Sequence, residues 1–196
     1  MAYEPSERRP DEPSAPRVAK IMVAGGLGAG KTTMVGAVSE SRTLHTEEDL
    51  SDRGAAVDDL AGIEGKATTT VAMDFGRITI SEDVVLYLFG TPGQSRFSFL
   101  WDDLALGALG AVVLADTRRL ADCFPCVDYL EERGMPFIVA VNCFEGARMY
   151  RLEEVRRALN LEPSVPVRLC DARKRESGKQ VLIALLKHLR PGVRKI

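Results

Sequence analysis

A glycine-rich segment near the start of the chain, Gly25 to Thr32 (GGLGAGKT), carries the clearest chemistry in the sequence. It satisfies the pattern G-x-x-x-x-G-K-[ST], whose backbone N–H groups surround the phosphates of a nucleotide. In this pattern the lysine, here Lys31, reaches the β- and γ-phosphates, and the hydroxyl residue, here Thr32, binds Mg²⁺. The sequence therefore predicts nucleotide binding, with phosphate contacts from Gly26, Leu27, Gly28, Ala29, Gly30, Lys31, Thr32 and Thr33.

A second pattern follows a predicted strand further along the chain. Residues Gly90 to Gln94 (GTPGQ) resemble the D-x-x-G-Q element of Ras-like GTPases. The resemblance implies that the Gly93 amide senses the γ-phosphate and that Gln94 orients the attacking water, while Lys31 absorbs developing charge. Gly90, however, stands where that element has an aspartate that holds Mg²⁺ through water.

Two further residues are candidates for the metal. Residues Thr70 to Phe75 (TVAMDF) are similar to the T-x-G-x-D-F segment of the same superfamily. This implies that Thr70 closes over Mg²⁺ and the γ-phosphate, with Thr68 and Thr69 as alternatives. Asp116 ends a predicted strand that should lie beside the phosphate loop. We consider it as a replacement for the missing metal aspartate, or alternatively as the N-cap of the following helix.

Two later loops are candidates for binding the base. Residues 142–145 (NCFE) stand where this superfamily has N-K-x-D, with Cys143 in place of the lysine that stacks and braces the loop. A carboxylate at the fourth position can accept hydrogen bonds from guanine N1 and N2. Residues 171–173 (DAR) resemble the S-A-K element, whose central amide faces guanine O6. The alternative to base binding is that these are two solvated loops. If the loops bind a base, guanine is favoured over adenine. The predicted base-binding residues are Asn142, Glu145, Asp171, Ala172 and Arg173.

Apolar strands alternate with amphipathic helices along the chain, and the candidate binding loops lie between these elements. It predicts an α/β fold whose mostly parallel sheet is covered on both faces, made mixed by one hairpin, with six strands and about five helices. The long polar stretch Thr43 to Lys66 is predicted to be a loop. The predicted strands are residues 18–25, 70–80, 84–89, 110–116, 137–142 and 165–171, and the predicted helices are residues 34–42, 97–108, 120–132, 152–161 and 177–189.

Length and composition set the outer limits. The 196 residues suit one domain, which we place at residues 17–196 after a polar, proline-rich tail at residues 1–16. A net charge of −2 argues against nucleic acid as a partner, and the apolar runs are too short for insertion in a membrane. The four cysteines, including the C-x-x-C of Cys123 and Cys126, are expected to be packing residues in a reducing cytoplasm.

Taken together, the motifs GTPGQ, VNCFEG and LCDAR resemble the MglA-like bacterial branch of the Ras-like small GTPases. They are most similar to the actinobacterial conservon GTP-binding proteins of the CvnD type. The resemblance implies a three-layer P-loop NTPase fold (a Ras-like G domain), GTP or GDP and Mg²⁺ as ligands, and GTP hydrolysis that is slow without a partner. It also implies a roadblock (MglB-like) regulatory protein and a complex with a membrane sensor resembling a histidine kinase, which would bring the protein to the membrane periphery.

One residue of the phosphate loop departs from this superfamily. Leu27 stands where many small GTPases have glycine, and its side chain would crowd the γ-phosphate and any arginine supplied by a partner. Two alternatives to a GTP-hydrolysing switch therefore remain. One is a nucleotide-binding scaffold that scarcely hydrolyses, and the other is an ATP-dependent P-loop enzyme such as a small-molecule kinase.

Overall fold

The computed structural model describes residues 16–42, 44–49, 70–93 and 99–189, and of residues 44–49 and 70–72 it describes the backbone alone. In this part of the chain seven strands form one sheet, in the order β2-β3-β4-β1-β5-β6-β7. Strand β3 runs antiparallel to β2 and β4, and the other pairs are parallel. The strands are β1 (Arg17–Gly25), β2 (Leu44–Asp49), β3 (Thr70–Ser81), β4 (Val84–Gly90), β5 (Ala108–Ala115), β6 (Phe137–Asn142) and β7 (Val167–Cys170).

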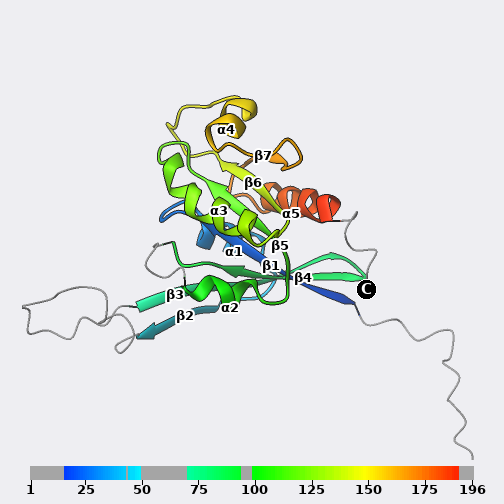
Figure 1. The fold of residues 1–196 in the computed structure, drawn as a ribbon. Helices are drawn as coiled ribbons and strands as arrows, with labels where there is room; N and C mark the ends of the chain where they lie inside the picture. Colours follow the sequence, from blue (N-terminus) through cyan, green and yellow to red (C-terminus); the bar gives the residue numbers. More distant parts are fainter. Residues whose placement is uncertain (1–15, 43, 50–69, 94–98, 190–196) are drawn as a thin grey trace, which may run out of the picture.

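Helices cover both faces of the sheet and give a three-layer arrangement (Figure 1). One apolar core joins the sheet to α1 (Lys31–Val38) and α5 (Arg175–Leu189). The other core joins it to α2 (Trp101–Ala105), α3 (Phe124–Glu132) and α4 (Leu152–Ala158), with the 3₁₀ turn η2 (Leu120–Cys123) before α3. Central strand β1 contributes Ile21 and Val23 to the first core and Met22 and Ala24 to the second. A strand buried on both faces is typical of a parallel sheet flanked by helices.

The predicted α/β class and the mixed, mostly parallel sheet are confirmed. The structure adds β2, an edge strand inside the stretch that was predicted to be a loop, so the hairpin becomes a three-stranded antiparallel unit. Helix α2 is shorter than the helix predicted there, and α5 begins at Arg175. The predicted tail lies outside the described residues except for residue 16, and β1 begins at Arg17.

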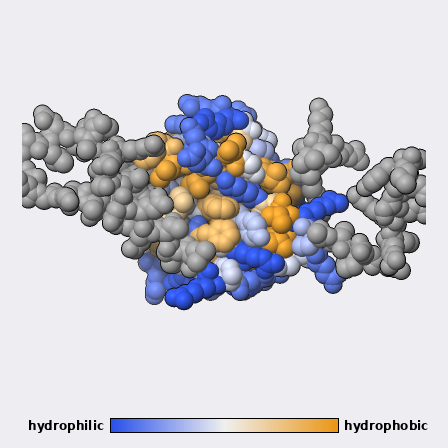
Figure 2. Space-filling model, turned by 90° about the horizontal axis from the view of Figure 1, so that it is seen from below, coloured by the Kyte–Doolittle hydropathy of each residue, from blue (hydrophilic) through white to orange (hydrophobic). Residues whose placement is uncertain are grey.

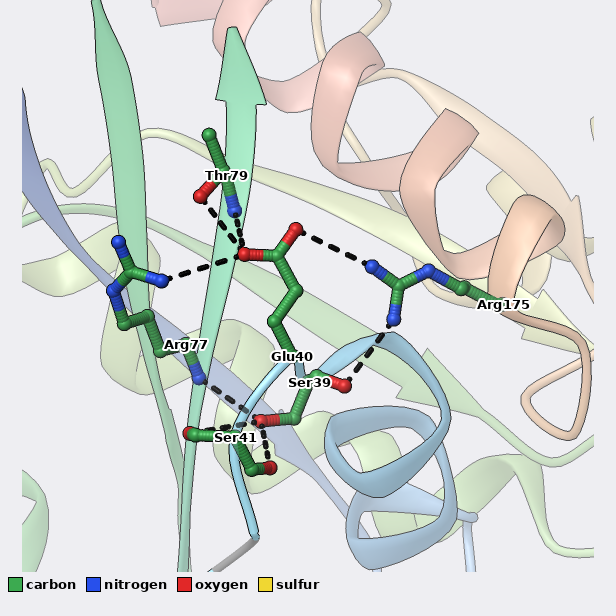
Figure 3. Close-up of polar contacts among 6 residues, drawn as sticks. All are labelled: Ser39, Glu40, Ser41, Arg77, Thr79 and Arg175. Atoms are coloured by element: carbon green, nitrogen blue, oxygen red, sulfur yellow. Dashed lines mark hydrogen bonds and ion pairs between the residues drawn. The ribbon is translucent and has the colours of Figure 1, made fainter. Parts of the chain in front are cut away.

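A polar cluster joins the end of α1 to β3 and α5 (Figure 3). The Glu40 carboxylate accepts hydrogen bonds from the backbone N–H and the hydroxyl of Thr79, at 3.0 and 2.8 Å. It also forms ion pairs with Arg77 at 3.4 Å and with Arg175, the first residue of α5, at 3.3 Å. Glu40 therefore connects three elements that are far apart in the sequence, and it fixes β3 relative to the helical layer.

The surface on the side of α2 is mixed rather than uniformly polar. Figure 2 shows this face from below, where hydrophobic residues gather in patches between hydrophilic ones. Leu106, directly after α2, is the most exposed large apolar residue in the described chain. Among the described residues, no helix combines the length and the apolar character needed to cross a membrane.

Candidate nucleotide-binding site

The glycine-rich loop connects the end of β1 to the start of α1, as the sequence predicts. Gly25 and Gly30 have φ angles of 140° and 102°, in the region that favours glycine. A Cβ atom at Gly25 would lie 2.4 Å from the Leu114 carbonyl oxygen, and one at Gly30 would lie 2.5 Å from Asn142 Nδ2. Both the backbone conformation and the close neighbours therefore require glycine at these two positions.

Lys31 lies under this loop and is only 8% exposed. Its ammonium group donates hydrogen bonds to the carbonyl oxygens of Gly25 and Gly26, at 2.8 and 2.7 Å. Burial lowers the pKa of Lys31, because desolvation disfavours the charged form. Gly93 packs against the same group: a Cβ atom there would lie 2.8 Å from Lys31 Nζ and 2.9 Å from Leu27 Cα. The two predicted phosphate-sensing segments thus meet at the lysine.

An aspartate that motif analysis did not select lies beside Thr32, the threonine predicted to bind Mg²⁺. The Thr32 hydroxyl donates a 2.6 Å hydrogen bond to Asp74 Oδ2, and Asp74 is 6% exposed. Asp74 is paired across the β3–β4 ladder with Gly90, the residue that stands at the aspartate position of the D-x-x-G-Q element. A Cβ atom at Gly90 would lie 3.0 Å from Asp74 Cβ and 3.1 Å from its Oδ2. A carboxylate from the neighbouring strand therefore occupies the space next to Gly90.

Asn142 ties three loops together at the ends of β1, β6 and β7. Its amide nitrogen donates to the Ala29 carbonyl at 2.9 Å, and its Oδ1 accepts from the Ala172 backbone N–H at 3.0 Å. Because Asn142 is only 5% exposed, both bonds are shielded from water. The structure thus places the predicted base-binding loops against the phosphate loop, as expected where parallel strands end on one edge of a sheet.

The other predicted base-binding residues lie nearer the surface. Asp171 accepts hydrogen bonds from the backbone N–H of Arg173 at 3.2 Å and from its Nε at 2.9 Å, and it also pairs with Lys174. These contacts, the Arg173 side chain first, hold the pKa of Asp171 well below its usual range. Glu145 is exposed, and its carboxylate contributes a small part of the upward shift in the pKa of Arg173, after the dominant effect of Asp171.

Asp116 is buried, but its carboxylate is bound to Arg118 and not to the phosphate loop. It accepts a hydrogen bond from Arg118 Nη2 at 2.7 Å and from the backbone N–H of the same residue at 2.9 Å. The latter bond closes a turn after β5 and does not cap a helix, since the N-cap of η2 is Arg119. Asp74, rather than Asp116, is the carboxylate that contacts Thr32.

Gln94 lies outside the described residues, and Thr70 is described only as the first backbone position of β3. The alternatives Thr68 and Thr69 also lie outside the described residues.

In the described part, a cavity of about 620 Å³ opens beside the phosphate loop. Its lining includes Gly26, Leu27, Gly93, Trp101 and Cys126.

Comparison with known proteins places the chain in a family. Residues 23–190 match the model of a family described as "Conserved hypothetical ATP binding protein". A curated relative, the uncharacterized protein MJ1339 of Methanocaldococcus jannaschii, is 30% identical over 125 residues, which cover 63% of this chain and 68% of the relative.

Solved structures with the same fold include G domains of an iron transporter. The chain is similar to the G domain of T. maritima FeoB (TM-score 0.59, 16% identity, 91% of this chain and 100% of that one). It is also similar to the FeoB G domain of Methanococcus jannaschii (TM-score 0.60, 14% identity, 89% and 99%). The T. maritima FeoB cytosolic domain in a GDP form gives a TM-score of 0.65 at 16% identity, over 90% of this chain and 65% of that one. At these identities the likeness shows the fold alone: a P-loop G domain.

Proposed function

We propose that the chain, which belongs to the family described as conserved hypothetical ATP binding proteins, is a P-loop nucleotide switch that binds GTP with Mg²⁺ and hydrolyses it slowly. The observation that carries this proposal is the contact of Asp74 with Thr32, opposite Gly90. A G domain without an aspartate at Gly90 lacks one expected support for the metal. Asp74 supplies a carboxylate in that place from the adjacent strand.

The residues around Thr32 fit a magnesium ion. Mg²⁺ prefers oxygen ligands, and it usually combines one or two protein groups with water and substrate phosphates. Thr32 would bind the ion directly, and the buried Asp74 carboxylate would support it through Thr32. Thr70 is proposed to close over the same position in the triphosphate state. When bound, the ion neutralises charge on the β- and γ-phosphates.

The remaining chemistry is assigned to the chain's own side chains. Lys31 exchanges its hydrogen bonds with the Gly25 and Gly26 carbonyls for phosphate oxygens, which keeps a buried ammonium paired in both states. Gly93, packed against Lys31, brings its backbone N–H to the γ-phosphate. Gln94 orients the attacking water, as it would in related GTPases. Release of phosphate then loosens Gly93 and Thr70, so the chain presents different surfaces in its two states.

A conservative substitution tests the metal assignment. Asp74→Asn preserves the shape and can still accept the Thr32 hydrogen bond, but it removes the charge. We expect the Mg²⁺ concentration required for half-maximal GTP binding to rise about 10- to 100-fold, the usual effect of removing an outer partner of a metal ligand. Asp83→Asn, at an exposed aspartate in the β3–β4 turn, is the control and should leave the requirement unchanged. An unchanged requirement in Asp74→Asn would remove the metal role.

A second function is favoured by Leu27, whose side chain is 54% exposed at the phosphate loop. A leucine in this position obstructs an arginine arriving from a partner, and this supports a scaffold that holds nucleotide without hydrolysing it. Single-turnover hydrolysis of GTP, alone and with a roadblock-type protein, separates the two functions. Phosphate release under either condition supports the switch, whereas none under both supports the scaffold.

The purine is a separate question, because the family description names ATP. Our proposal of GTP is supported by Glu145, an exposed carboxylate in the same loop as Asn142, which can accept hydrogen bonds from guanine N1 and N2. The nucleotide retained by the purified protein, together with competition of labelled GTP by ATP, tests this choice. Stronger competition by ATP would move the chain to the ATP-dependent alternative.

The partners are proposed from the motif resemblance. We expect a roadblock (MglB-like) regulator to bind the GTP form more tightly than the GDP form, and a membrane sensor complex to recruit the protein from the cytoplasm to the membrane periphery. Pull-down with nucleotide-loaded protein tests the first expectation. Equal capture in both nucleotide states would argue against it.

A further inference from the structure

A stacked pair of side chains stands beside the base loops. The guanidinium carbon of Arg118 lies 3.8 Å from the centre of the Phe144 ring, which places the flat group over the ring face. Arg118 follows β5, whereas Phe144 follows β6, two residues after Asn142. The Thr117 hydroxyl also donates a 3.4 Å hydrogen bond to the Arg148 carbonyl, so the two loops are joined at a second point.

Asp116 fixes the plane of this guanidinium group. Arg118 Nε donates to Asp116 Oδ1 at 2.9 Å and Nη2 donates to Oδ2 at 2.7 Å, a two-point contact that a lysine could not make. The Asp116 side chain is 7% exposed, while that of Arg118 is 49% exposed. The Asp116 carboxylate is therefore buried. It pairs with the flat guanidinium group of Arg118 and holds it in place, while the Arg118 side chain remains about half exposed.

The position of Arg118 is relevant because the base loop, residues 142–145, lacks the residue that usually stacks against the base. Cys143 stands where related proteins have the lysine that stacks against the base, and its short side chain cannot cover a purine. Arginine stacks on aromatic faces more readily than lysine, because its guanidinium is planar and weakly hydrated. Arg118 sits on a loop that is bonded to the Cys143 loop, and it is already immobilised before a ligand arrives.

We propose that the Arg118 guanidinium, backed by Phe144 and held by Asp116, is the plate on which the purine base stacks, in place of the missing lysine. This proposal rests on the proposed nucleotide binding and extends it to the base. Stacking uses the ring face, which guanine and adenine share, so the plate acts equally on GTP and ATP. Selection between the purines is left to groups at the ring edge, such as Glu145.

The test compares a ligand with a base and a ligand without one. Binding of ribose-labelled GDP and its displacement by inorganic tripolyphosphate are measured with Mg²⁺ for the wild type and for Arg118→Ala. We expect the variant to lose about 5- to 30-fold in GDP affinity, the range expected for one cation–π contact. Its affinity for tripolyphosphate should remain within about twofold, because the phosphate loop is untouched. Arg118→Lys should lose nearly as much GDP affinity as alanine.

The chain offers a matched control for the same chemistry elsewhere. Arg133 also lies over an aromatic ring, that of Tyr129 at 4.3 Å, and also pairs with a carboxylate, Asp102, but it follows α3. Arg133→Ala should therefore leave both affinities unchanged.

Each outcome decides between the two proposals. Equal losses for GDP and tripolyphosphate in Arg118→Ala would overturn the stacking role, as would no loss for either. If the wild type binds neither GDP, GTP nor ATP, the proposed function fails and the base plate fails with it. If the wild type binds GDP and Arg118→Ala binds it equally well, only the base plate fails.

Discussion

The bridge made by Asn142 should contribute a large part of the stability of the ligand-free protein. In Asn142→Ala the Ala29 carbonyl and the Ala172 N–H both lose their partner, and both residues are almost fully buried. An unsatisfied buried polar group costs about 1–2 kcal/mol, so the two together predict a loss of about 2–4 kcal/mol. With a urea m value of about 2 kcal/mol/M, the unfolding midpoint should fall by about 1–2 M.

Urea titration followed by circular dichroism measures this shift, and a second variant examines its cause. Asn142→Asp keeps the acceptor for Ala172 but turns a carboxylate toward the Ala29 carbonyl. The loss of unfolding free energy in Asn142→Asp should be smaller at low pH than at pH 7, because a protonated carboxyl can again donate to the Ala29 carbonyl. Gln180→Ala, on the exposed side of α5, should shift the midpoint little. A loss below about 0.5 kcal/mol in Asn142→Ala would refute the reasoning, since it would match an ordinary surface substitution.

Two further predictions concern titrating groups. The hydrogen bond from the Thr79 hydroxyl is the main cause that lowers the pKa of Glu40, so its stabilisation is present above the unfolded-state pKa and is lost as the pH falls through the folded value. Glu40→Gln should therefore lower the free energy of unfolding by about 1 kcal/mol at pH 7. In urea titrations at several pH values, the difference from the wild type should begin to close below about pH 4.3. A difference that persists at pH 2 would contradict this. Burial raises the pKa of Cys123 to about 12 and of Cys126 to about 11, which leaves both thiols protonated at pH 8. Iodoacetamide should then label the half-buried Cys143 first, and rapid labelling of the C-x-x-C pair in intact-mass spectra would show that these thiols are accessible.

Much of the fold follows from local patterns in the sequence. The apolar runs of β5 and β6, buried on both faces, are recognisable as central strands, and the phosphate loop marks the step from β1 to α1. Strand β2 could not be recognised in this way. Its residues, LHTEED, are mostly polar and lack the alternation that marks a half-buried strand. Its strand conformation comes from pairing with β3, which is a tertiary contact.

Motifs in the sequence located the phosphate loop, whereas the contact of Asp74 with Thr32 depends on the register of the sheet. Gly90 was recognised as a departure, but the carboxylate of Asp74 lies on another strand and is brought opposite Gly90 only by the β3–β4 pairing. A signal did exist. Asp74, Gly76 and Ile78 alternate along β3 and lie on its buried face. A single aspartate on a buried strand face requires a partner. The contact between Arg118 and Phe144 was not predicted for a similar reason, since it depends on two loops meeting.

The hydrogen bond between Thr32 and Asp74 has a consequence for the hydroxyl itself. A threonine hydroxyl normally rotates about its C–O bond and points its hydrogen in several directions. Here the hydrogen is directed at the carboxylate, so the oxygen lone pairs face away from Asp74 whenever the protein is folded. Association with a cation therefore does not need to freeze this rotor. The loss of torsional entropy takes place during folding, and the oxygen is oriented before its first encounter with metal.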